Sequence, residues 1–186
     1  MAITNLIAFD DAPFPKHHRG DVLLVGTVCA GTRLDGVLAS KVRRDGRNAT
    51  GRMIEMIEGS QFGRTVRAVL LQGIAVAGFN VVDVHALHDR LKVPVLVIAR
   101  RRPDFAAIRR ALFRRVKGAE RKWRLIPAAG RQESMGPIFV QRVGIDQTGT
   151  RDLLRATTLH GNLPEALRLA HLIAGGVTTG VSRGRA

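Results

Sequence analysis

The sequence is poor in cysteine and in long apolar runs, and each shortage excludes a class of protein. Cys29 is the only cysteine, which excludes an internal disulfide framework and a zinc site built from several thiolates. No apolar run reaches the roughly 18–20 residues that a membrane-spanning helix needs. The first residues carry no basic segment, and Asp10 interrupts them too early for a signal peptide. We therefore expect a cytoplasmic protein with no membrane partner.

Acidic residues are also scarce. Fifteen Asp and Glu stand against thirty Lys and Arg, which gives a formal net charge of +15. A positive field of this size attracts polyanions, and DNA or RNA is the commonest partner of that kind. Only five of the bases are lysines. A GC-rich genome also tends to produce arginine-rich chains, so codon usage is an alternative source of part of this charge.

What is present is enough for one folded unit. The chain has 186 residues, of which 45% are hydrophobic and 24% are charged, so it can bury a core. This balance excludes intrinsic disorder, collagen-like chains and coiled coils. No internal repeat or low-complexity segment divides the sequence. We predict a single domain over residues 1–186.

The first half of the chain predicts three strands followed by a helix. The strand patterns cover residues 3–9, 21–30 and 37–44, and a turn pattern covers residues 31–36. Asn48 is placed to cap the helix. Met53, Ile54 and Ile57 recur within it at helical spacing.

The second half alternates buried-type strands with helices. Strands are predicted at residues 66–71, 93–99 and 138–143. Helices are predicted at residues 77–91, 103–116, 150–158 and 164–174. Residues 118–137 show the least regular pattern and predict an exposed loop. An antiparallel meander that continues into βα units predicts an α/β fold with a mixed sheet and helices on both faces.

Polar side chains stand where several predicted strands end. Asp10 and Asp11 end the first strand, Asp45 the third and Gln72 the fourth. Acids gathered at one edge of a sheet need a cation or arginines to balance their charge, and a hard divalent ion is held by oxygen ligands of this kind. Aspartates are also common in turns and at helix caps. The residues alone leave both interpretations open.

The last helix carries three polar residues at successive spacings of three, Glu165, Arg168 and His171. They share roughly one face of a helix otherwise rich in leucine and alanine. His171 fits a site facing the acids, but it equally fits a hydrogen-bonded core histidine. Glu165 and Arg168 also fit a local ion pair.

One segment concentrates the positive charge. Residues 100–124 hold nine arginines and two lysines against two acids. Arginine binds phosphate through paired hydrogen bonds, so this segment predicts a nucleic-acid contact, although a solvated helix face is the alternative. The arginines that we assign to the contact are Arg100, Arg101, Arg109, Arg110, Arg114 and Arg115. Trp123 fits the core better than a base-stacking role.

Three segments together resemble a known family. Residues 9–14 (FDDAPF), 73–83 (GIAVAGFNVVD) and 164–171 (PEALRLAH) are similar to signature segments of the endonuclease dU family, in the same order and spacing. That family is a relative of endonuclease V, and the resemblance runs from residue 8 to residue 186. It implies an RNase H-like fold and a metal centre, with Mg²⁺ or Mn²⁺, that hydrolyses phosphodiesters.

The resemblance also implies roles for particular residues. Asp10 matches the first-strand aspartate of endonuclease V, Asp45 its third-strand acid, and His171 its late-helix ligand. Gln72 stands where that enzyme has an aspartate. We therefore expect Asp10, Asp45 and His171 to be catalytic. The expected metal ligands are Asp10, Asp11, Asp45 and Gln72, and the expected supporting residues are Asp83, Glu165 and Arg168.

Two departures from the family relative bear on activity. Gln72 is an amide, which coordinates magnesium without contributing charge, so the metal is held more weakly unless Asp11 or Asp83 compensates. The chain has no tyrosine, so the tyrosine wedge by which endonuclease V probes damaged base pairs is absent.

Three functions follow for testing. The first is a metal-dependent endonuclease that cuts DNA near a deaminated base such as deoxyuridine, with DNA as its expected partner and RNA as an alternative partner. The second is a nucleic-acid-binding domain with weak or no catalysis, which Gln72 favours. The third is a hydrolase of a phosphorylated small molecule, whose binding would lack the steep salt dependence of a polyanion complex.

Overall fold

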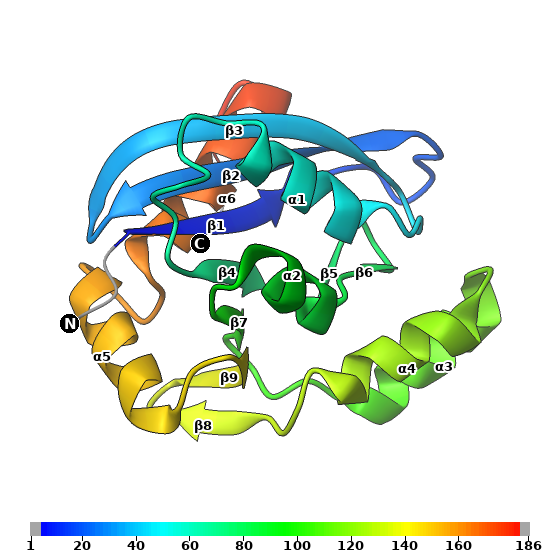
Figure 1. The fold of residues 1–186 in the computed structure, drawn as a ribbon. Helices are drawn as coiled ribbons and strands as arrows, with labels where there is room; N and C mark the ends of the chain where they lie inside the picture. Colours follow the sequence, from blue (N-terminus) through cyan, green and yellow to red (C-terminus); the bar gives the residue numbers. More distant parts are fainter. Residues whose placement is uncertain (1–4, 183–186) are drawn as a thin grey trace.

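The computed structural model describes residues 5–182, which form a seven-stranded sheet with helices on both faces (Figure 1). The strands lie in the order β3-β2-β1-β4-β7-β9-β8. Their bounds are β1 Asn5–Asp11, β2 Asp21–Ala30, β3 Arg33–Arg43, β4 Val69–Gln72, β7 Val95–Ala99, β8 Glu133–Met135 and β9 Ile138–Val143. The three central strands β1, β4 and β7 are parallel, and the outer pairs are antiparallel. The predicted mixed α/β sheet is confirmed.

Helices cover both faces of this sheet. Their bounds are α1 Ala49–Glu58, α2 Val84–Leu91, α3 Phe105–Arg115, α4 Ala119–Ala128, α5 Gln147–Thr157 and α6 Glu165–Thr179. Helices α1 and α2 share one core cluster with the sheet, and α5 and α6 share a second cluster on the opposite face. Helices α3 and α4 lie side by side at one end of the molecule (Figure 1) and enclose a small apolar cluster of their own.

Strand β1 is buried because it lies between β2 and β4 in the sheet. Its residues Leu6 to Phe9 have no exposed surface, and the polar residues follow where the strand leaves the core. Helix α6 crosses β1 and β2 through small side chains, since Ala166, Ala170 and Ala174 are fully buried. The hydroxyl of Thr27 donates a 2.7 Å hydrogen bond to the carbonyl of Ala166. This packing fixes α6 across the end of β1.

The prediction of one helix over residues 77–91 is wrong for its first half. A small hairpin of β5 (Ala75–Val76) and β6 (Asn80–Val81) precedes the helix, which is α2. Ala77 and Gly78 at the hairpin turn have φ angles of 47° and 81°, outside the helical region. The buried Asn80 side chain accepts from the Ala49 N–H and donates to the Arg43 carbonyl. Tertiary hydrogen bonds therefore override the helical spacing of the apolar residues.

The prediction of an exposed loop over residues 118–137 is also wrong. This segment contains helix α4 and strand β8. Gly118, with a φ of 72°, starts the helix, and Lys122 and Ile126 are its buried residues. Because a lysine occupies a buried position of α4, the apolar periodicity of this helix is not visible in the sequence.

Smaller differences concern the ends of elements. Strand β1 extends to Asp11, and the predicted residues 3 and 4 lie outside the described part of the chain. Strand β3 begins at Arg33, so the turn before it is shorter than predicted. Asn48 stands at the N-cap of α1, but its side chain accepts from the Arg43 N–H instead of capping the helix. None of the helices within residues 5–182 has the length and apolar character of a membrane span.

Candidate active site

Asp10 and His171 meet at the carboxyl end of strand β1. Oδ2 of Asp10 lies 2.9 Å from Nδ1 of His171, which α6 brings from 161 positions further along the chain. Asp10 is 8% exposed, whereas the His171 side chain is about one-third exposed. The second carboxylate oxygen of Asp10 accepts from the Asp11 N–H at 3.0 Å. The pair thus combines a buried carboxyl group with an accessible imidazole.

The two neighbouring carboxyl groups have raised pKa values. Burial raises the pKa of Asp10, while the hydrogen bond and charge of His171 and the positive charge of Arg100 oppose the rise. Burial and the negative charge of Asp10 together raise the pKa of Asp11 to about 6, against a backbone hydrogen bond from Ala77. Their ionisation costs free energy, and a cation placed here would lower that cost.

Gln72 lies next to Asp10 in the sheet. The parallel pairing of Phe9 with Leu71 places the next residues of β1 and β4 side by side. Ala8 and Leu70 belong to the core cluster on the α6 side, so strand alternation directs Asp10 and Gln72 to that same side. Oε1 of Gln72 is buried and has no hydrogen-bond partner among the described residues. A buried acceptor without a donor costs about 1–3 kcal/mol, so this atom is available to a bound group.

Asp11 and Asp45 lie elsewhere. Asp11 alternates to the face opposite Asp10 and faces the backbone of Ala77. Oδ1 of Asp45 accepts from the Phe79 N–H at 2.8 Å, and its backbone N–H donates to the Ala77 carbonyl at 2.9 Å. Asp45 therefore fastens the end of β3 to the β5–β6 hairpin.

The expected metal ligands are thus only partly brought together. Within residues 5–182, no three His, Cys, Asp or Glu side chains form a group that could hold a metal. Asp10, Gln72 and His171 do share one end and one face of the sheet. Magnesium keeps several water ligands and is often held by one or two carboxylates together with substrate phosphates. One carboxylate and the unpaired amide oxygen fit an ion held in that way.

The three supporting residues have structural partners. Oδ1 of Asp83 accepts from the Ala86 N–H at 3.0 Å and caps α2. Glu165 forms a two-point ion pair with Arg168, which lowers the pKa of the Glu165 carboxyl group. This is the local ion pair that the spacing allowed, and it shapes the first turn of α6 rather than the Asp10 site.

The predicted arginines fall into two groups. Arg100 and Arg101 follow β7, and the charge of Arg100 acts on Asp10. The others lie on the exposed surface of α3, and they are Arg109, Arg110, Arg114 and Arg115. The Arg109 guanidinium lies 5.2 Å from the Phe113 ring and 5.9 Å from the Trp123 ring. Trp123 itself packs against the small cluster between α3 and α4, in line with the expected core role.

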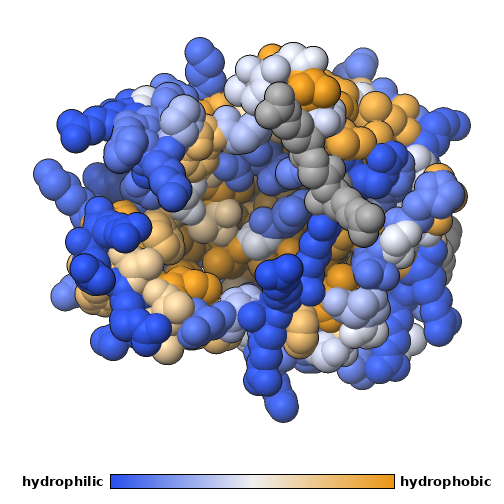
Figure 2. Space-filling model, turned by 180° about the vertical axis from the view of Figure 1, so that it is seen from behind, coloured by the Kyte–Doolittle hydropathy of each residue, from blue (hydrophilic) through white to orange (hydrophobic). Residues whose placement is uncertain are grey.

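An apolar cavity of about 200 Å³ lies on the α1 and α2 side of the sheet, since its wall includes Val97 of that core cluster. It begins at Gly73, the residue after Gln72, and its walls include Phe79 and Phe105, with the Gln132 amide at its edge. Seen from behind, the molecule has a hollow in which hydrophobic residues are exposed, with hydrophilic residues around it (Figure 2). This cavity is not visible in the sequence, because its lining comes from separate elements that include β5, β7, α3 and α4.

Sequence reasoning also missed Lys122. Its Nζ donates to the carbonyl groups of Asp45, Gly46 and Phe79 at 2.5–2.6 Å. Burial lowers the pKa of Lys122, which the negative charge of Asp45 partly opposes. The signal in the sequence was its spacing of four from Ile126, but a lysine is normally assigned to the surface.

Comparison with known proteins places this geometry in a family. The family described as Endonuclease dU matches residues 3–178. A UPF0215 protein of Deinococcus radiodurans is 49% identical over 183 residues, which cover 98% of this chain and 93% of the relative. A crystal structure of a protein of unknown function from Archaeoglobus fulgidus superposes with a TM-score of 0.88 at 30% identity, covering 95% of this chain and 99% of that one.

A more distant structure identifies the fold. Endonuclease V of Ciona intestinalis, solved with a 24mer DNA containing an inosine followed by a ribo-adenosine, has a TM-score of 0.58 at 12% identity. The superposition covers 90% of this chain and 82% of that one. The protein therefore has the RNase H-like fold of endonuclease V, as the resemblance implied. It belongs to the endonuclease dU family, and family and fold together support a nuclease-like role.

Proposed function

We propose that this protein is a metal-dependent endonuclease that hydrolyses a DNA phosphodiester near a deaminated base of the deoxyuridine type. One observation carries the proposal: the buried Asp10 carboxyl group, the His171 imidazole and the unpaired Gln72 oxygen lie together at the carboxyl end of the central strands. The name of the matching family and the inosine-containing DNA bound by the Ciona enzyme support the choice of substrate.

Asp10 and Gln72 would hold a Mg²⁺ or Mn²⁺ ion. When bound, such an ion would polarise the scissile phosphate and lower the pKa of an attacking water. Nδ1 of His171 is engaged by Asp10, so Nε2 is the ring atom from which the histidine exchanges a proton with the attacking water or the leaving oxygen. Arg100, whose charge already acts on Asp10, adds positive charge beside the reacting phosphate.

The apolar cavity beside Gly73 supports recognition of a single base. Its volume of about 200 Å³ is of the size of one nucleobase. Aromatic side chains such as Phe79 and Phe105 stack on bases, and enzymes that act at a damaged base often turn that base out of the duplex. Gly73 in the cavity wall directly follows Gln72, so we expect the phosphate of an extruded base to lie at the end of β4.

A nicking assay tests the proposal. Labelled duplexes that carry deoxyuridine, deoxyinosine or no lesion are incubated with Mg²⁺, Mn²⁺ or a chelator. We expect cutting that requires both the lesion and the metal, and a loss of at least about 100-fold, or nearly 3 kcal/mol of activation free energy, in Asp10→Ala and His171→Ala. Asp21→Ala, an exposed aspartate on β2, is the matched control. Cutting that survives Asp10→Ala would refute the assignment of the site.

A second candidate is a nucleic-acid-binding domain with little or no catalysis. The observation that favours it is the single carboxylate at the centre, since no group of three acidic, histidine or cysteine ligands occurs within residues 5–182. This candidate predicts no cutting in either metal, together with binding that weakens steeply as salt rises.

A further inference from the structure

A second cavity, of about 650 Å³, has Asp45 in its lining and is strongly basic. Its lining contains five Lys or Arg residues, one acidic residue and two histidines. We call this the basic pocket, and the residues used in the argument are Lys16, His18, Arg43, Arg44, Asp45 and Lys117. Of these, Lys117 alone belongs to the arginine-rich segment 100–124, where it lies between α3 and α4.

The one acid of the basic pocket is already compensated. Oδ2 of Asp45 lies 3.3 Å from Nε of Arg44, and its Oδ1 accepts from the Phe79 N–H. Arg43 faces Asp21 at 3.7 Å, but both side chains are more than half exposed, so that contact is weak. Within residues 5–182, Lys16 and Lys117 have no carboxylate within ion-pair distance. The pocket therefore retains positive charge that no group of the described chain neutralises.

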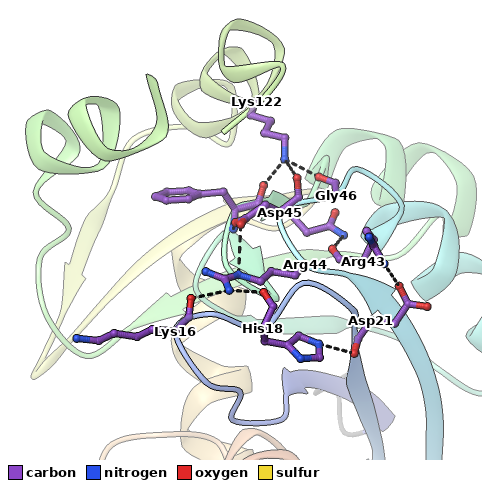
Figure 3. Close-up of polar contacts among 10 residues, drawn as sticks. Lys16, His18, Asp21, Arg43, Arg44, Asp45, Gly46 and Lys122 are labelled. Atoms are coloured by element: carbon purple, nitrogen blue, oxygen red, sulfur yellow. Dashed lines mark hydrogen bonds and ion pairs between the residues drawn. The ribbon is translucent and has the colours of Figure 1, made fainter. Parts of the chain in front are cut away.

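The wall of the basic pocket is held in place by Arg44 (Figure 3). Nη1 of Arg44 donates to the carbonyl of Lys16 at 2.7 Å and to the carbonyl of His18. The His18 ring bonds the Asp21 carbonyl at 3.0 Å, and the Arg44 guanidinium stacks 5.4 Å from the Phe14 ring. A preorganised loop loses less conformational entropy when it binds a ligand.

The backbone at Asp45, which borders the basic pocket, is held by Lys122 (Figure 3), whose Nζ donates to the carbonyls of Asp45 and Gly46. These carbonyl oxygens would otherwise repel an anion. Because Arg44 engages the carbonyls of Lys16 and His18 and Lys122 engages that of Asp45, the groups left to a ligand are mainly cationic donors.

We propose that the basic pocket binds a backbone phosphate of the nucleic acid at a distance from the reacting phosphate. The proposal rests on the proposed function for the identity of the ligand. A polymer is favoured over a small phosphorylated molecule because one residue, Ala77, contacts both regions. The Ala77 carbonyl accepts from Asp45 in the basic pocket, and the Ala77 N–H faces Asp11, the neighbour of Asp10. A continuous strand can place separate phosphates in both.

The test is a binding measurement that needs no cleavage. The double variant Lys16→Ala/Lys117→Ala is made in an Asp10→Asn background, and its affinity for a labelled duplex is measured by fluorescence anisotropy over a salt series. Both lysines are exposed, so the fold is expected to persist. We expect an affinity loss of about tenfold and a salt dependence whose slope falls by about two.

The matched control removes two exposed arginines elsewhere, Arg64→Ala/Arg151→Ala, with the same change in net charge. An equal effect of the two double variants would overturn the proposal. Calorimetry with inorganic pyrophosphate separates the ligand sources. If pyrophosphate binding depends on the two lysines and duplex binding does not, the ligand is a small phosphorylated molecule and the proposal fails.

The nicking assay separates this failure from failure of the proposed function. If the wild type cuts at the lesion and the two lysine substitutions leave duplex affinity unchanged, only the phosphate site in the basic pocket is refuted. No cutting, with duplex binding that depends on the two lysines, refutes the nuclease and keeps the basic pocket.

Discussion

Asp10 and Asp45 are two aspartates of one sequence that the tertiary structure has placed in opposite circumstances. Asp10 ends a central strand, is buried against His171 and has a raised pKa. Asp45 stands just beyond β3 with a φ of 51°, and its carboxylate bonds the backbone N–H of Phe79. The carboxyl group of Asp10 is costly to ionise, whereas that of Asp45 stabilises a turn. Burial beside a histidine therefore suits Asp10 to chemistry, whereas the hydrogen bonds of Asp45 give it a structural role.

Among the variants near Asp45, Lys122→Met is expected to lower the free energy of unfolding most. This change leaves three carbonyl groups without their donor in a buried setting, so we expect a loss of about 3 kcal/mol or more in the free energy of unfolding. Urea unfolding measures it. Lys41→Met, at an exposed position of β3, is the control and should change stability by less than about 0.5 kcal/mol. A loss below about 1 kcal/mol in Lys122→Met would show that these bonds do not hold the turn.

Asp45→Ala should cost about 2 kcal/mol, because the Phe79 N–H loses its acceptor and Arg44 loses its counter-charge. Asp45→Asn keeps an acceptor oxygen and suits the left-handed backbone, so it should retain most of that stability. Thermal unfolding of the pair measures the difference. If instead both variants fold like the wild type and both lose nicking, Asp45 belongs to the chemistry and the contrast with Asp10 collapses.

The pH dependence of stability tests whether the carboxyl groups at the end of β1 are costly to ionise. The pKa of Asp11 is about 6 in the folded protein against an ordinary value of 3.8. Because the pKa of Asp11 is higher in the folded than in the unfolded protein, its contribution to stability is fully present below about pH 3.8. That contribution is lost as the pH rises through about 6. Asp11→Asn cannot ionise, so its stability relative to the wild type should rise between about pH 4 and 7.

We expect that gain to reach on the order of 1–2 kcal/mol, since Asp11 is only partly buried. Urea unfolding with a chelator present, at several pH values, measures it. Asp21→Asn, on exposed β2, should show no such trend. A difference between Asp11→Asn and wild type that stays constant with pH would mean that Asp11 titrates as an ordinary exposed acid.

The smallest expected effect is a gain of activity. Gln72→Asp supplies a second carboxylate beside Asp10 and should raise metal-dependent nicking about tenfold, or about 1.4 kcal/mol in activation free energy. The same change at the exposed Gln61 controls for added charge. No gain over that control, in a variant that binds metal more tightly, would favour the binding domain over the nuclease.

Much of the fold was predictable from local patterns. Segments rich in β-branched residues, such as residues 21–30 and 93–99, correspond to strands β2 and β7, and the helix predicted over residues 103–116 corresponds to α3, which Asp104 caps. The β5–β6 hairpin and α4 were missed for the same reason. Polar residues, Asn80 in one case and Lys122 in the other, are buried there by hydrogen bonds to distant backbone groups. Local periodicity contains no information about such partners.

The candidate site was predictable in part. Asp10, Gln72 and His171 were expected near one another, and the structure brings them to one face. Asp11 and Asp45 were also expected among the metal ligands, but the sequence does not show where their side chains point. Strand alternation sends Asp11 to the other face, and the turn after β3 directs Asp45 to the hairpin. The basic pocket had no local signal because its residues come from three separate segments.

By itself, the sequence determined the positive charge, most of the segments that form strands and helices, and the polar residues that end the central strands. These features depend on composition and short-range spacing. Only the tertiary structure decided which of those polar residues meet. Asp10 meets His171 across 161 positions, and Asp45 meets Phe79 across 34. Such contacts are set by how the sheet and helices pack, and packing depends on the whole chain at once.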